Sequence, residues 1–371
     1  MKITHVISSL ATGGAQRIVA DLLPEIAAAP GIEVQLVVFS HSGSDIENEL
    51  LSCPRIKTTF LDISSRHPAG WRRLRPFIRE ADIVHAHLFP VNYQVALANI
   101  GIGKPLVFTE HSTHNKRRDH RWLRIPERWM YGRYDRIVAI SKGVEEALAG
   151  WIGASADDPR ILVIANGIDI KRFSESRPPG GNSFGREGRA ILMVSRFTAA
   201  KDHASVVKSL RHIKADDAFV AFAGEGPTLD SVRELAGSEG VADRVVFLGN
   251  RTDIPELVKS ASVGVQASHW EGFGLTVVEM MAGGLPVVAS DVSGLREIVG
   301  DKGLLVLPGN ACALAEAFDR ILGDTRLSGR MSREGMEYAR QFSIGKCAER
   351  HIDMYKEIAR QELRPLRSSR S

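Results

Sequence analysis

One stretch of sequence, EGFGLTVVE at residues 271–279, decides the fold and the site, and it continues as MMAGGLPVVAS at residues 280–290. Two glycines flank an aromatic residue, and a helix-compatible run with apolar residues on one face starts at once. This pattern predicts a glycine turn at the N-terminus of a helix. Free backbone N–H groups and the positive end of the helix dipole make such a turn a site for an anion, most often a phosphate.

Two carboxylates accompany this turn. Glu271 precedes it and Glu279 falls in the first turns of the helix, so both can face the same cleft. Carboxylates are poor partners for phosphate but good acceptors for the hydroxyl groups of a sugar. A pocket that offers amides to a diphosphate and acids to hydroxyl groups predicts a nucleotide-sugar ligand.

The pattern Glu-x7-Glu enclosing Gly-Phe-Gly-Leu, followed by Ala-x-Gly-x-Pro-Val-Val-Ala-Ser, resembles the donor site of the retaining glycosyltransferases of family 4 (glycosyl transferases group 1). The resemblance is strongest in the C-terminal half and continues through the N-terminal half. It implies the GT-B fold, an α/β architecture of two Rossmann-like doubly wound parallel-sheet domains facing a cleft. It also implies that a C-terminal helix returns to the first domain.

The length of 371 residues independently favours two domains, because it exceeds the size at which one hydrophobic core usually keeps growing. A stretch rich in Pro, Gly, Asn and Ser follows the turn Asn166-Gly167, which in the resembled family marks the crossing between the domains. We therefore expect an acceptor-binding domain over 1–170, a linker over 171–188, a donor-binding domain over 189–345, and a crossover helix and tail over 346–371.

Short, near-continuously apolar runs recur along both halves, as expected for parallel strands covered by helices on both faces. Ligands in such sheets bind beyond the carboxyl ends of the strands. The expected strands are 3–7, 34–39, 83–86, 106–109, 137–140 and 162–164 in the first half, and 191–194, 218–223, 245–248, 263–267, 287–289 and 304–307 in the second half.

The first expected strand runs into the glycine turn ATGGAQR at residues 11–17 and then into an amphipathic helix. Strand, glycine turn and helix are the opening of a doubly wound domain. The turn lacks the spacing Gly-x-Gly-x-x-Gly, so it does not predict a dinucleotide site. The resemblance assigns Gly13 to the acceptor and Gly14 to the donor phosphate; the alternative is that both glycines only permit a tight turn.

Histidines mark the carboxyl ends of two expected strands of the first half: His85 and His87 at one, His111 at the other. A histidine at a strand end is commonly just a polar surface residue. The resemblance instead places His111 beside the transferred sugar, as part of the catalytic set, and His87 on the acceptor side.

Arg196 and Lys201 follow the first expected strand of the second half. They can converge on one anion, the guanidinium as a fork and the ammonium as a point charge, and so neutralise a diphosphate leaving group. The resemblance places Asn250 and Arg251 against the nucleobase. The amides of Phe273, Gly274 and Leu275 would bind the diphosphate, Glu279 the ribose hydroxyls and Glu271 the donor sugar.

The segment 114–136 concentrates positive charge, with eight Lys and Arg residues against three acids in a chain whose net charge is only +4. Its arginines alternate with Trp122, Trp129 and other apolar residues. This composition predicts a surface that lies on anionic lipid. The alternative is a solvated arginine-rich helix whose tryptophans point inward. Nucleic acid is not an expected partner, because no recognition module surrounds the segment.

The three cysteines, Cys53, Cys312 and Cys347, lack the spacing of a disulfide framework or a zinc site and indicate a reducing compartment. The N-terminus reads as a strand rather than a secretion signal, and no run reaches the ~18 apolar residues of a membrane span. We therefore expect a cytoplasmic protein that associates peripherally with the inner face of the cytoplasmic membrane.

Together these features predict an enzyme that transfers a hexosyl or N-acetylhexosaminyl group with retention, without metal or cofactor, from a nucleoside-diphosphate sugar, with a UDP-sugar preferred. The expected acceptor is a lipid-linked or polyprenyl-linked bacterial surface glycan: lipopolysaccharide, capsule or exopolysaccharide. Two alternatives are a soluble small-molecule acceptor such as an aminocyclitol, and a nucleotide-sugar epimerase on the same fold.

Overall fold

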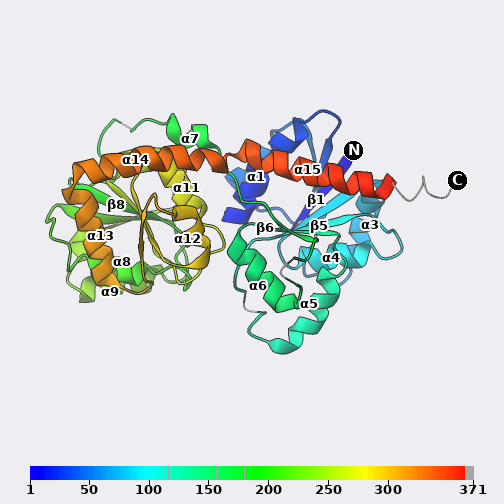
Figure 1. The fold of residues 1–371 in the computed structure, drawn as a ribbon, viewed down its shortest axis with the longest axis horizontal. Helices are drawn as coiled ribbons and strands as arrows, with labels where there is room; N and C mark the ends of the chain where they lie inside the picture. The colour runs from blue at the N-terminus through cyan, green and yellow to red at the C-terminus, as the bar shows by residue number, and fades with distance from the viewer. Residues whose placement is uncertain (116, 156, 179, 364–371) are drawn as a thin grey trace. The chain divides into compact units, whose positions relative to one another are not determined.

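A computed structural model of the chain describes residues 1–115, 117–155, 157–178 and 180–363 (Figure 1). The chain divides into two compact units, one made of Met1–Gly167 with Ile344–Ser371 and the other of Ile168–Ser343. These are called here the first and the second domain. Each is built around its own parallel sheet.

The sheet of the first domain has seven strands in the order β3-β2-β1-β4-β5-β6-β7, all pairs parallel. The order reverses between β1 and β4, which is the switch point of a doubly wound sheet. The strands are β1 (Lys2–Ile7), β2 (Glu33–Val38), β3 (Ile56–Phe60), β4 (Ile83–His87), β5 (Leu106–Glu110), β6 (Arg136–Ala139) and β7 (Ile161–Val163).

Helices connect these strands and bury apolar faces against the sheet. Ser141 accepts a hydrogen bond from Val144 N and caps α6, as its position before that helix predicts. The helical segments are α1 (Gly14–Ala27), α2 (Asp45–Leu51), α3 (Gly70–Glu80), α4 (Val91–Ala98), η1 (Arg121–Leu123), α5 (Arg124–Tyr131), α6 (Lys142–Ile152) and α15 (Ile344–Leu363).

The sheet of the second domain has six strands in the order β10-β9-β8-β11-β12-β13, again all parallel. Its order reverses between β8 and β11. The strands are β8 (Arg189–Val194), β9 (Ala218–Ala223), β10 (Val245–Gly249), β11 (Val263–Gln266), β12 (Val287–Ser290) and β13 (Leu304–Val306).

Several helices of the second domain begin at an aspartate that accepts hydrogen bonds from the first turn, Asp202 before α8 and Asp324 before α14 among them. The helical segments are α7 (Ile170–Ser174), α8 (His203–Ser209), α9 (Leu229–Ser238), η2 (Ala242–Arg244), α10 (Ile254–Ser260), α11 (Leu275–Ala282), α12 (Ser293–Val299), α13 (Ala311–Gly323), α14 (Thr325–Ala339) and η3 (Arg340–Phe342).

Every strand expected from the sequence is present, with small shifts at the ends, so the prediction of an α/β fold with two doubly wound sheets is confirmed. Sequence reasoning missed β3, whose residues IKTTF contain a lysine and two threonines and give no continuous apolar run. As an edge strand, β3 pairs with β2 alone and does not need an apolar face on both sides.

The expected linker over 171–188 is part of the second domain. Ile168 pairs with Ser343, so the chain enters and leaves this domain side by side. Phe173 on α7 is buried, and the ring of Phe184 packs edge-on against Phe219 of β9. Two apolar side chains within a stretch otherwise rich in Pro, Gly, Asn and Ser therefore pack it onto the second domain. Pro179 lies outside the described residues.

The C-terminal helix returns to the first domain, as the resemblance implied. In Figure 1, α15 runs along α1, and its residues Cys347, Met354 and Tyr355 belong to the same buried core as Ile3 and Leu22. The tail residues Arg364, Arg367 and Arg370 lie outside the described residues. No helix in the described part of the chain combines the length and apolar character needed to cross a membrane.

Candidate active site

Lys201 and Glu271 lie together near the carboxyl ends of β8 and β11, the strands at which the order of the second sheet reverses. The Lys201 ammonium forms an ion pair with Glu271 Oε2, and a backbone bridge joins Lys201 to Ser268. The two side chains are 17% and 20% exposed. The structure therefore joins two predicted catalytic residues that are 70 positions apart, and a ligand can reach both.

Glu271 is held by neutral groups as well. Gln266 Nε2 lies 3.4 Å from Glu271 Oε2 and 3.2 Å from Ser268 Oγ, and the N–H of Gly272 donates to Glu271 Oε1 over 3.3 Å. The side chain of Gln266 is fully buried and its Oε1 has no hydrogen-bond partner among the described residues. Sequence reasoning missed Gln266, although a glutamine interrupting an apolar strand was a signal.

Gly274 forms the turn ahead of α11, as the sequence predicts. Its φ of 92° is left-handed, and a Cβ there would lie 2.4 Å from Leu295 Cδ2, so glycine is required. No side chain in the described structure caps α11, which leaves its positive end open to an anion. Leu275 begins the helix and Glu279 lies one turn later, both half-buried.

The side chain of Phe273 is buried, which does not affect the prediction that its backbone amide binds the diphosphate. Its side chain is 2% exposed and packs edge-on against Phe342, with ring centroids 5.7 Å apart. Only its backbone can therefore face a ligand. The ring instead anchors the glycine turn in the core.

Arg196 follows the end of β8 and is exposed, and within the described residues it makes no ion pair. The loop that carries Arg196 packs closely against the loop that follows β9. A Cβ on Gly224 would lie 2.1 Å from the carbonyl oxygen of Ser195, and a Cβ on Gly226 would lie 2.2 Å from that of Phe197. Both glycines have positive φ, so the close approach of these two loops depends on them.

The predicted base-reading loop adjoins the same edge of the sheet. The Asn250 side-chain amide donates to Glu225 Oε2 over 2.9 Å, and the N–H of Gly224 donates to the carbonyl of Gly249. Arg251 is paired with Asp253 through two hydrogen bonds. Glu225 is a further candidate that the sequence did not single out, because one exposed acid in a glycine turn carries no distinctive pattern.

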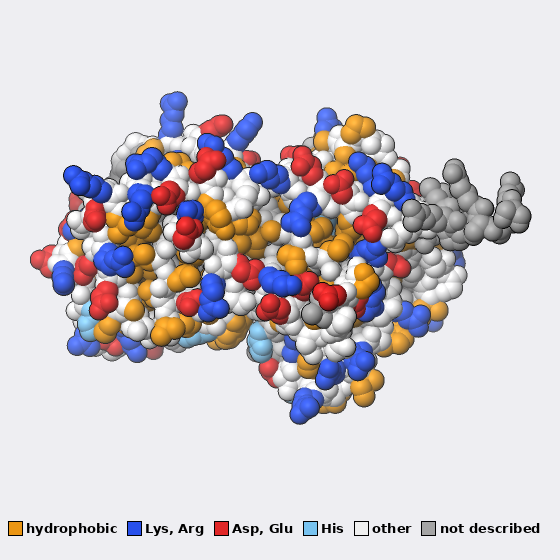
Figure 2. Space-filling model, in the orientation of Figure 1, with side chains coloured by type: hydrophobic (Ala, Val, Ile, Leu, Met, Phe, Trp, Pro, Cys, Tyr) orange, Lys and Arg blue, Asp and Glu red, His pale blue; other side chains and the backbone are white. Residues whose placement is uncertain are grey.

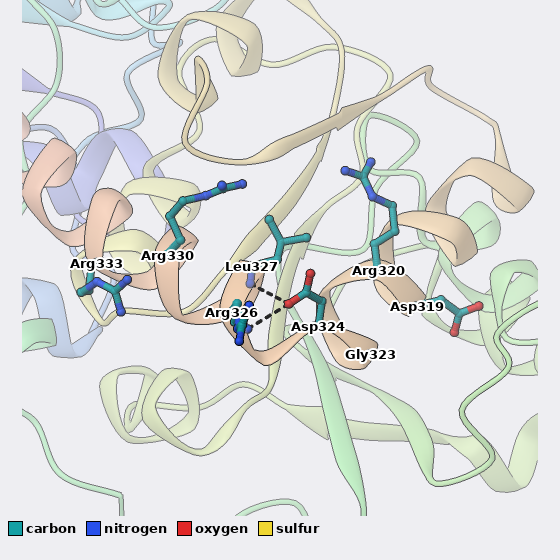
Figure 3. A pocket seen from close by; sticks show the side chains of 8 residues that line it. All are labelled: Asp319, Arg320, Gly323, Asp324, Arg326, Leu327, Arg330 and Arg333. Atoms are coloured by element: carbon teal, nitrogen blue, oxygen red, sulfur yellow. Dashed lines mark hydrogen bonds between the residues drawn. The ribbon is translucent and has the colours of Figure 1, made fainter.

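A cavity of about 660 Å³ lies elsewhere in the second domain, between α13 and α14 (Figure 3). Its two carboxylates are engaged by backbone N–H groups, Asp319 by that of Lys214 and Asp324 by the first turn of α14. It contains none of the residues predicted for the donor, so it is separate from the candidate active site. Its lining residues are Asp319, Arg320, Gly323, Asp324, Arg326, Leu327, Arg330 and Arg333.

In the first domain, Gly13 and Gly14 follow β1 at its switch point. Gly13 has an extended backbone that any residue can adopt, and Gly14 is the exposed first residue of α1. Neither glycine has a positive φ. A Cβ on Gly13 would meet only the flexible end of Gln16. Backbone strain therefore does not explain these glycines, and their contacts with an acceptor and a donor phosphate stay predictions.

His87 is placed differently from its expected contact with an acceptor. It is 2% exposed, and its Nε2 lies 3.0 Å from Nδ1 of His5, which stands on the adjacent strand β1. Its ring stacks on that of His85 at 4.3 Å. A buried ring with these neighbours cannot contact an acceptor as it lies. Sequence reasoning missed His5, although a polar residue inside an apolar strand was a signal.

His85 completes this buried cluster between the sheet and α15. Its Nδ1 lies 2.6 Å from the Tyr355 hydroxyl and its Nε2 lies 2.7 Å from Thr109 Oγ1. His5, His85 and His87 are the group in the described structure whose potential metal-ligating atoms lie within 4.8 Å of one another. Because both ring nitrogens of His85 already have partners, the arrangement is that of a hydrogen-bonded cluster rather than a set of open ligands.

Burial keeps these rings neutral. It lowers the pKa of His5 to about 3 and the pKa of His351, on α15, to about 4, and it holds the pKa of His85 and His87 well below the ordinary range. Burial also lowers the pKa of His111, directly after β5, to about 4, and its Nε2 is buried without a hydrogen-bond partner among the described residues. Its ring lies 6.2 Å from that of His87.

We expect the first domain to lose stability as the pH falls from about 6.5 towards 4. Histidines that are neutral in the folded state regain a pKa near 6.5 on unfolding, so unfolding takes up protons below that pH. The stabilisation is complete above pH 6.5. Each fully depressed histidine then removes up to about 1.4 kcal/mol per pH unit.

Urea unfolding at several pH values, followed by tryptophan fluorescence, checks this prediction, because Trp71, Trp122, Trp129 and Trp151 of the five tryptophans lie in the first domain. His351→Leu should flatten the dependence, whereas His120→Gln, at an exposed position, should not. A midpoint that stays constant from pH 7.5 to pH 5 would contradict the prediction.

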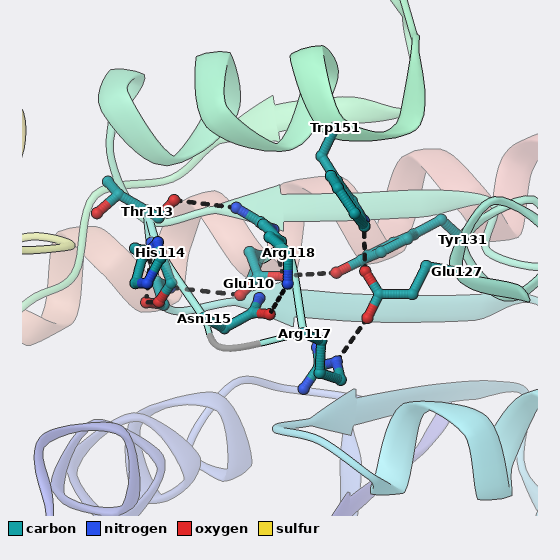
Figure 4. A network of polar contacts seen from close by, with 10 residues as sticks. Glu110, Thr113, His114, Asn115, Arg117, Arg118, Glu127, Tyr131 and Trp151 are labelled. Atoms are coloured by element: carbon teal, nitrogen blue, oxygen red, sulfur yellow. Dashed lines mark hydrogen bonds and ion pairs between the residues drawn. The ribbon is translucent and has the colours of Figure 1, made fainter. Parts of the chain in front are cut away.

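Two buried carboxylates organise the loop that follows His111 (Figure 4). Glu110 accepts from the Tyr131 hydroxyl over 2.6 Å and from Arg118 Nη2 over 3.2 Å. Glu127 has no exposed surface and accepts from Arg117 Nε and from the indole N–H of Trp151. These contacts tie the loop to α5 and α6.

This network corrects part of the expectation for the basic segment 114–136. Arg117 and Arg118 face the interior and cannot meet a membrane, and Arg136 pairs with Glu357 of α15. Lys116 lies outside the described residues. The segment still presents an apolar surface at its centre: Trp122 is 70%, Ile125 78% and Trp129 39% exposed, with exposed Arg121 and Arg128 beside them. The tryptophans therefore do not point inward.

In the comparisons with known proteins, each half of the chain matches a glycosyltransferase family model. The family model described as Glycosyltransferase Family 4 matches residues 12–172, and the model described as Glycosyl transferases group 1 matches residues 181–338. Both models cover residues singled out above, Gly13 to His111 in the first match and Arg196 to Glu279 in the second.

Individual relatives agree. The chain is 28% identical to the D-inositol 3-phosphate glycosyltransferase of Salinispora tropica, over 91% of this chain and 75% of that protein. It is 28% identical to the lipopolysaccharide core biosynthesis mannosyltransferase LpsB of Rhizobium meliloti, over 69% of this chain and 73% of that protein. The structure of Alr3699/HepE from Anabaena, in complex with UDP and glucose, superposes with a TM-score of 0.83 at 20% identity, covering 96% and 100% of the two chains.

Proposed function

Since the chain belongs to the glycosyl transferases group 1 and family 4 and has the GT-B fold, we propose that it moves a hexosyl or N-acetylhexosaminyl group from a nucleoside-diphosphate sugar to a hydroxyl group, with retention and without a metal ion. The observation that carries this proposal is the pairing of Lys201 with Glu271 beside the open end of α11. A cation, a carboxylate and free amides at one switch point match the parts of such a donor.

Departure of the diphosphate is the costly step, because negative charge gathers on its β-phosphate as the bond to the anomeric carbon breaks. Fixed cations and backbone dipoles aimed at that charge lower the barrier. Lys201, Arg196 and the amides of Gly274 and Leu275 supply them. The acceptor oxygen bonds to the anomeric carbon on the face that the phosphate leaves, and its proton passes to the departing phosphate oxygen.

The Lys201–Glu271 ion pair is the resting arrangement. A diphosphate carries more negative charge than a carboxylate and draws the lysine away from Glu271. The freed Glu271 then accepts hydrogen bonds from hydroxyl groups of the donor sugar, while Glu279 accepts them from the ribose. His111, kept neutral by burial, orients the transferred sugar by a hydrogen bond.

A UDP-sugar is the donor we propose, with Asn250 and Arg251 beside the base. The Anabaena protein of the same fold was determined with UDP, which supports this choice by analogy. The acceptor we propose is a lipid-linked surface glycan, in keeping with the lipopolysaccharide-core relative LpsB. The relative named for D-inositol 3-phosphate matches a larger share of this chain and favours a second candidate, a small soluble acceptor.

A panel of UDP-, GDP-, ADP- and dTDP-sugars tests the function directly. Each donor is added to the purified chain, and thermal stabilisation and slow hydrolysis of the donor are recorded. We expect one donor class to do both. If none of these donors binds or is hydrolysed by the folded chain, the proposed function is wrong.

We also propose that the surface formed by Trp122, Ile125 and Trp129 rests on anionic lipid. Figure 2 shows hydrophobic side chains next to Lys and Arg over this part of the first domain. Aromatic side chains enter the interface between headgroups and acyl chains, and arginines bind the headgroup phosphates. A soluble acceptor would need no such surface.

Trp122→Ala combined with Ile125→Ala is expected to weaken binding to vesicles containing phosphatidylglycerol at least about tenfold. Transfer of an exposed apolar side chain from water into the lipid contributes roughly 1.5–3 kcal/mol when its burial is complete. Sedimentation with vesicles at low and high salt measures this. Leu307→Ala removes an equally exposed apolar residue of the second domain, 66% exposed, and should bind like the wild type. Equal binding of all variants would contradict the proposal and favour the soluble acceptor.

A further inference from the structure

Gln266 is a buried polar residue to which the proposed reaction assigns no role. It is the last residue of β11, next to the switch point of the second sheet, and its side chain is fully buried. A buried amide whose oxygen has no partner is costly, by about 1–3 kcal/mol, and such a group calls for an explanation. An apolar residue would suit this strand position better, as Val263 and Val265 on the same strand show.

The side-chain amide of Gln266 contacts Glu271 and Ser268. Gln266 Nε2 lies 3.4 Å from Glu271 Oε2, the same carboxylate oxygen that the Lys201 ammonium contacts. It also lies 3.2 Å from Ser268 Oγ, which is 3.4 Å from the Lys201 ammonium. The glutamine and the lysine therefore converge on one oxygen of Glu271, and both also contact the hydroxyl of Ser268.

We infer that Gln266 is a positioning residue that keeps Glu271 oriented when the donor diphosphate draws Lys201 away, an inference that rests on the proposed function. Once the lysine leaves, the amide of Gln266 remains on Oε2 and the N–H of Gly272 remains on Oε1. The amide is neutral, so it fixes the direction of the carboxylate and leaves its charge intact. The charge then remains available to the sugar hydroxyls and to positive charge at the anomeric carbon.

The charged groups around Glu271 are consistent with this assignment. Lys201 is the cation in contact with it. Asp202, on the adjoining loop, is directed elsewhere, because it accepts from the backbone N–H groups of Ser205 and Gly309 and lies 3.9 Å from His269. The amide of Gln266 is thus a neutral donor that can stay on Glu271 when the lysine moves.

Gln266→Leu keeps the size of the side chain and removes the amide. We expect kcat to fall about tenfold or more, the effect of losing one hydrogen bond to a charged group, while the donor KM changes less than threefold. Binding of UDP, measured by titration calorimetry, should match the wild type, because Lys201 and the open end of α11 are unchanged. Intact UDP binding also shows that the variant is folded.

Gln266→Glu gives a readout that a merely structural role would not move. It places a second carboxyl group beside Glu271, and two neighbouring carboxyls resist ionising together. The acid limb of the profile of kcat/KM against pH should therefore shift to higher pH. A matched control is Gln35→Leu, since Gln35 is a buried strand glutamine of the first domain, 1% exposed and bonded to Thr4. This control should leave both kcat and the acid limb unchanged.

The outcomes separate this inference from the function on which it rests. A wild-type chain that turns over a nucleotide sugar, together with Gln266→Leu within twofold of its kcat and an unshifted Gln266→Glu profile, overturns the role of Gln266 alone. A wild-type chain that turns over no nucleotide sugar overturns both. A fall in kcat shared by Gln35→Leu also overturns the role, because it then reflects general loss of a buried amide.

Discussion

Replacing Lys201 with alanine is expected to lower turnover of the donor by between about a hundredfold and a thousandfold, the range found when one fixed donor to a developing negative charge is removed. In the proposed reaction the ammonium meets the β-phosphate as charge gathers there. Alanine leaves that phosphate with Arg196 and the helix amides as its stabilising groups. It also removes the ion pair between Lys201 and Glu271.

The measurement is the rate of donor hydrolysis or transfer with the nucleotide sugar that the donor panel identifies. Lys208→Ala is the matched control, because it removes an exposed lysine from α8 in the same domain. It should keep wild-type rates. A Lys201→Ala variant within tenfold of the wild type would show that the ion pair is structural and that the leaving group is stabilised elsewhere.

Arg117→Met is expected to destabilise the first domain by about 3 kcal/mol, at the lower end of the range for breaking a buried ion pair. The change leaves Glu127, which has no exposed surface, with the indole N–H of Trp151 as its hydrogen-bond donor among the described contacts. Arg117 is itself 22% exposed, so solvent screens part of the interaction. Methionine retains the packing of the side-chain stem, which isolates the loss of charge.

Urea unfolding followed by tryptophan fluorescence measures this change. Arg121→Met, at an exposed position in the same segment, should shift the free energy of unfolding by no more than about 0.5 kcal/mol. Adding Glu127→Gln to Arg117→Met should recover part of the loss, because the unpaired charge is gone. A single variant as stable as the wild type would contradict the prediction and show that the Arg117–Glu127 ion pair does not stabilise the domain.

The sequence alone determined every strand except β3, and the glycine turn, because these depend on local patterns. Runs such as 218–223 are apolar throughout because both faces of a parallel strand are covered, and Gly274 is needed wherever the backbone turns left-handed before α11. The motif from Glu271 to Glu279 also predicted where the proposed donor site lies. These features lie within a few residues of one another, so no knowledge of packing was needed.

Only the tertiary structure decided which distant side chains meet. Lys201 reaches Glu271 because β8 and β11 are neighbours in the sheet, and Arg117 turns inward because a buried carboxylate on α5 attracts it. His87, expected near an acceptor, is instead buried and stacked on histidines from two neighbouring strands. Strand order and burial set these contacts, and neither is encoded in the spacing of residues along the chain.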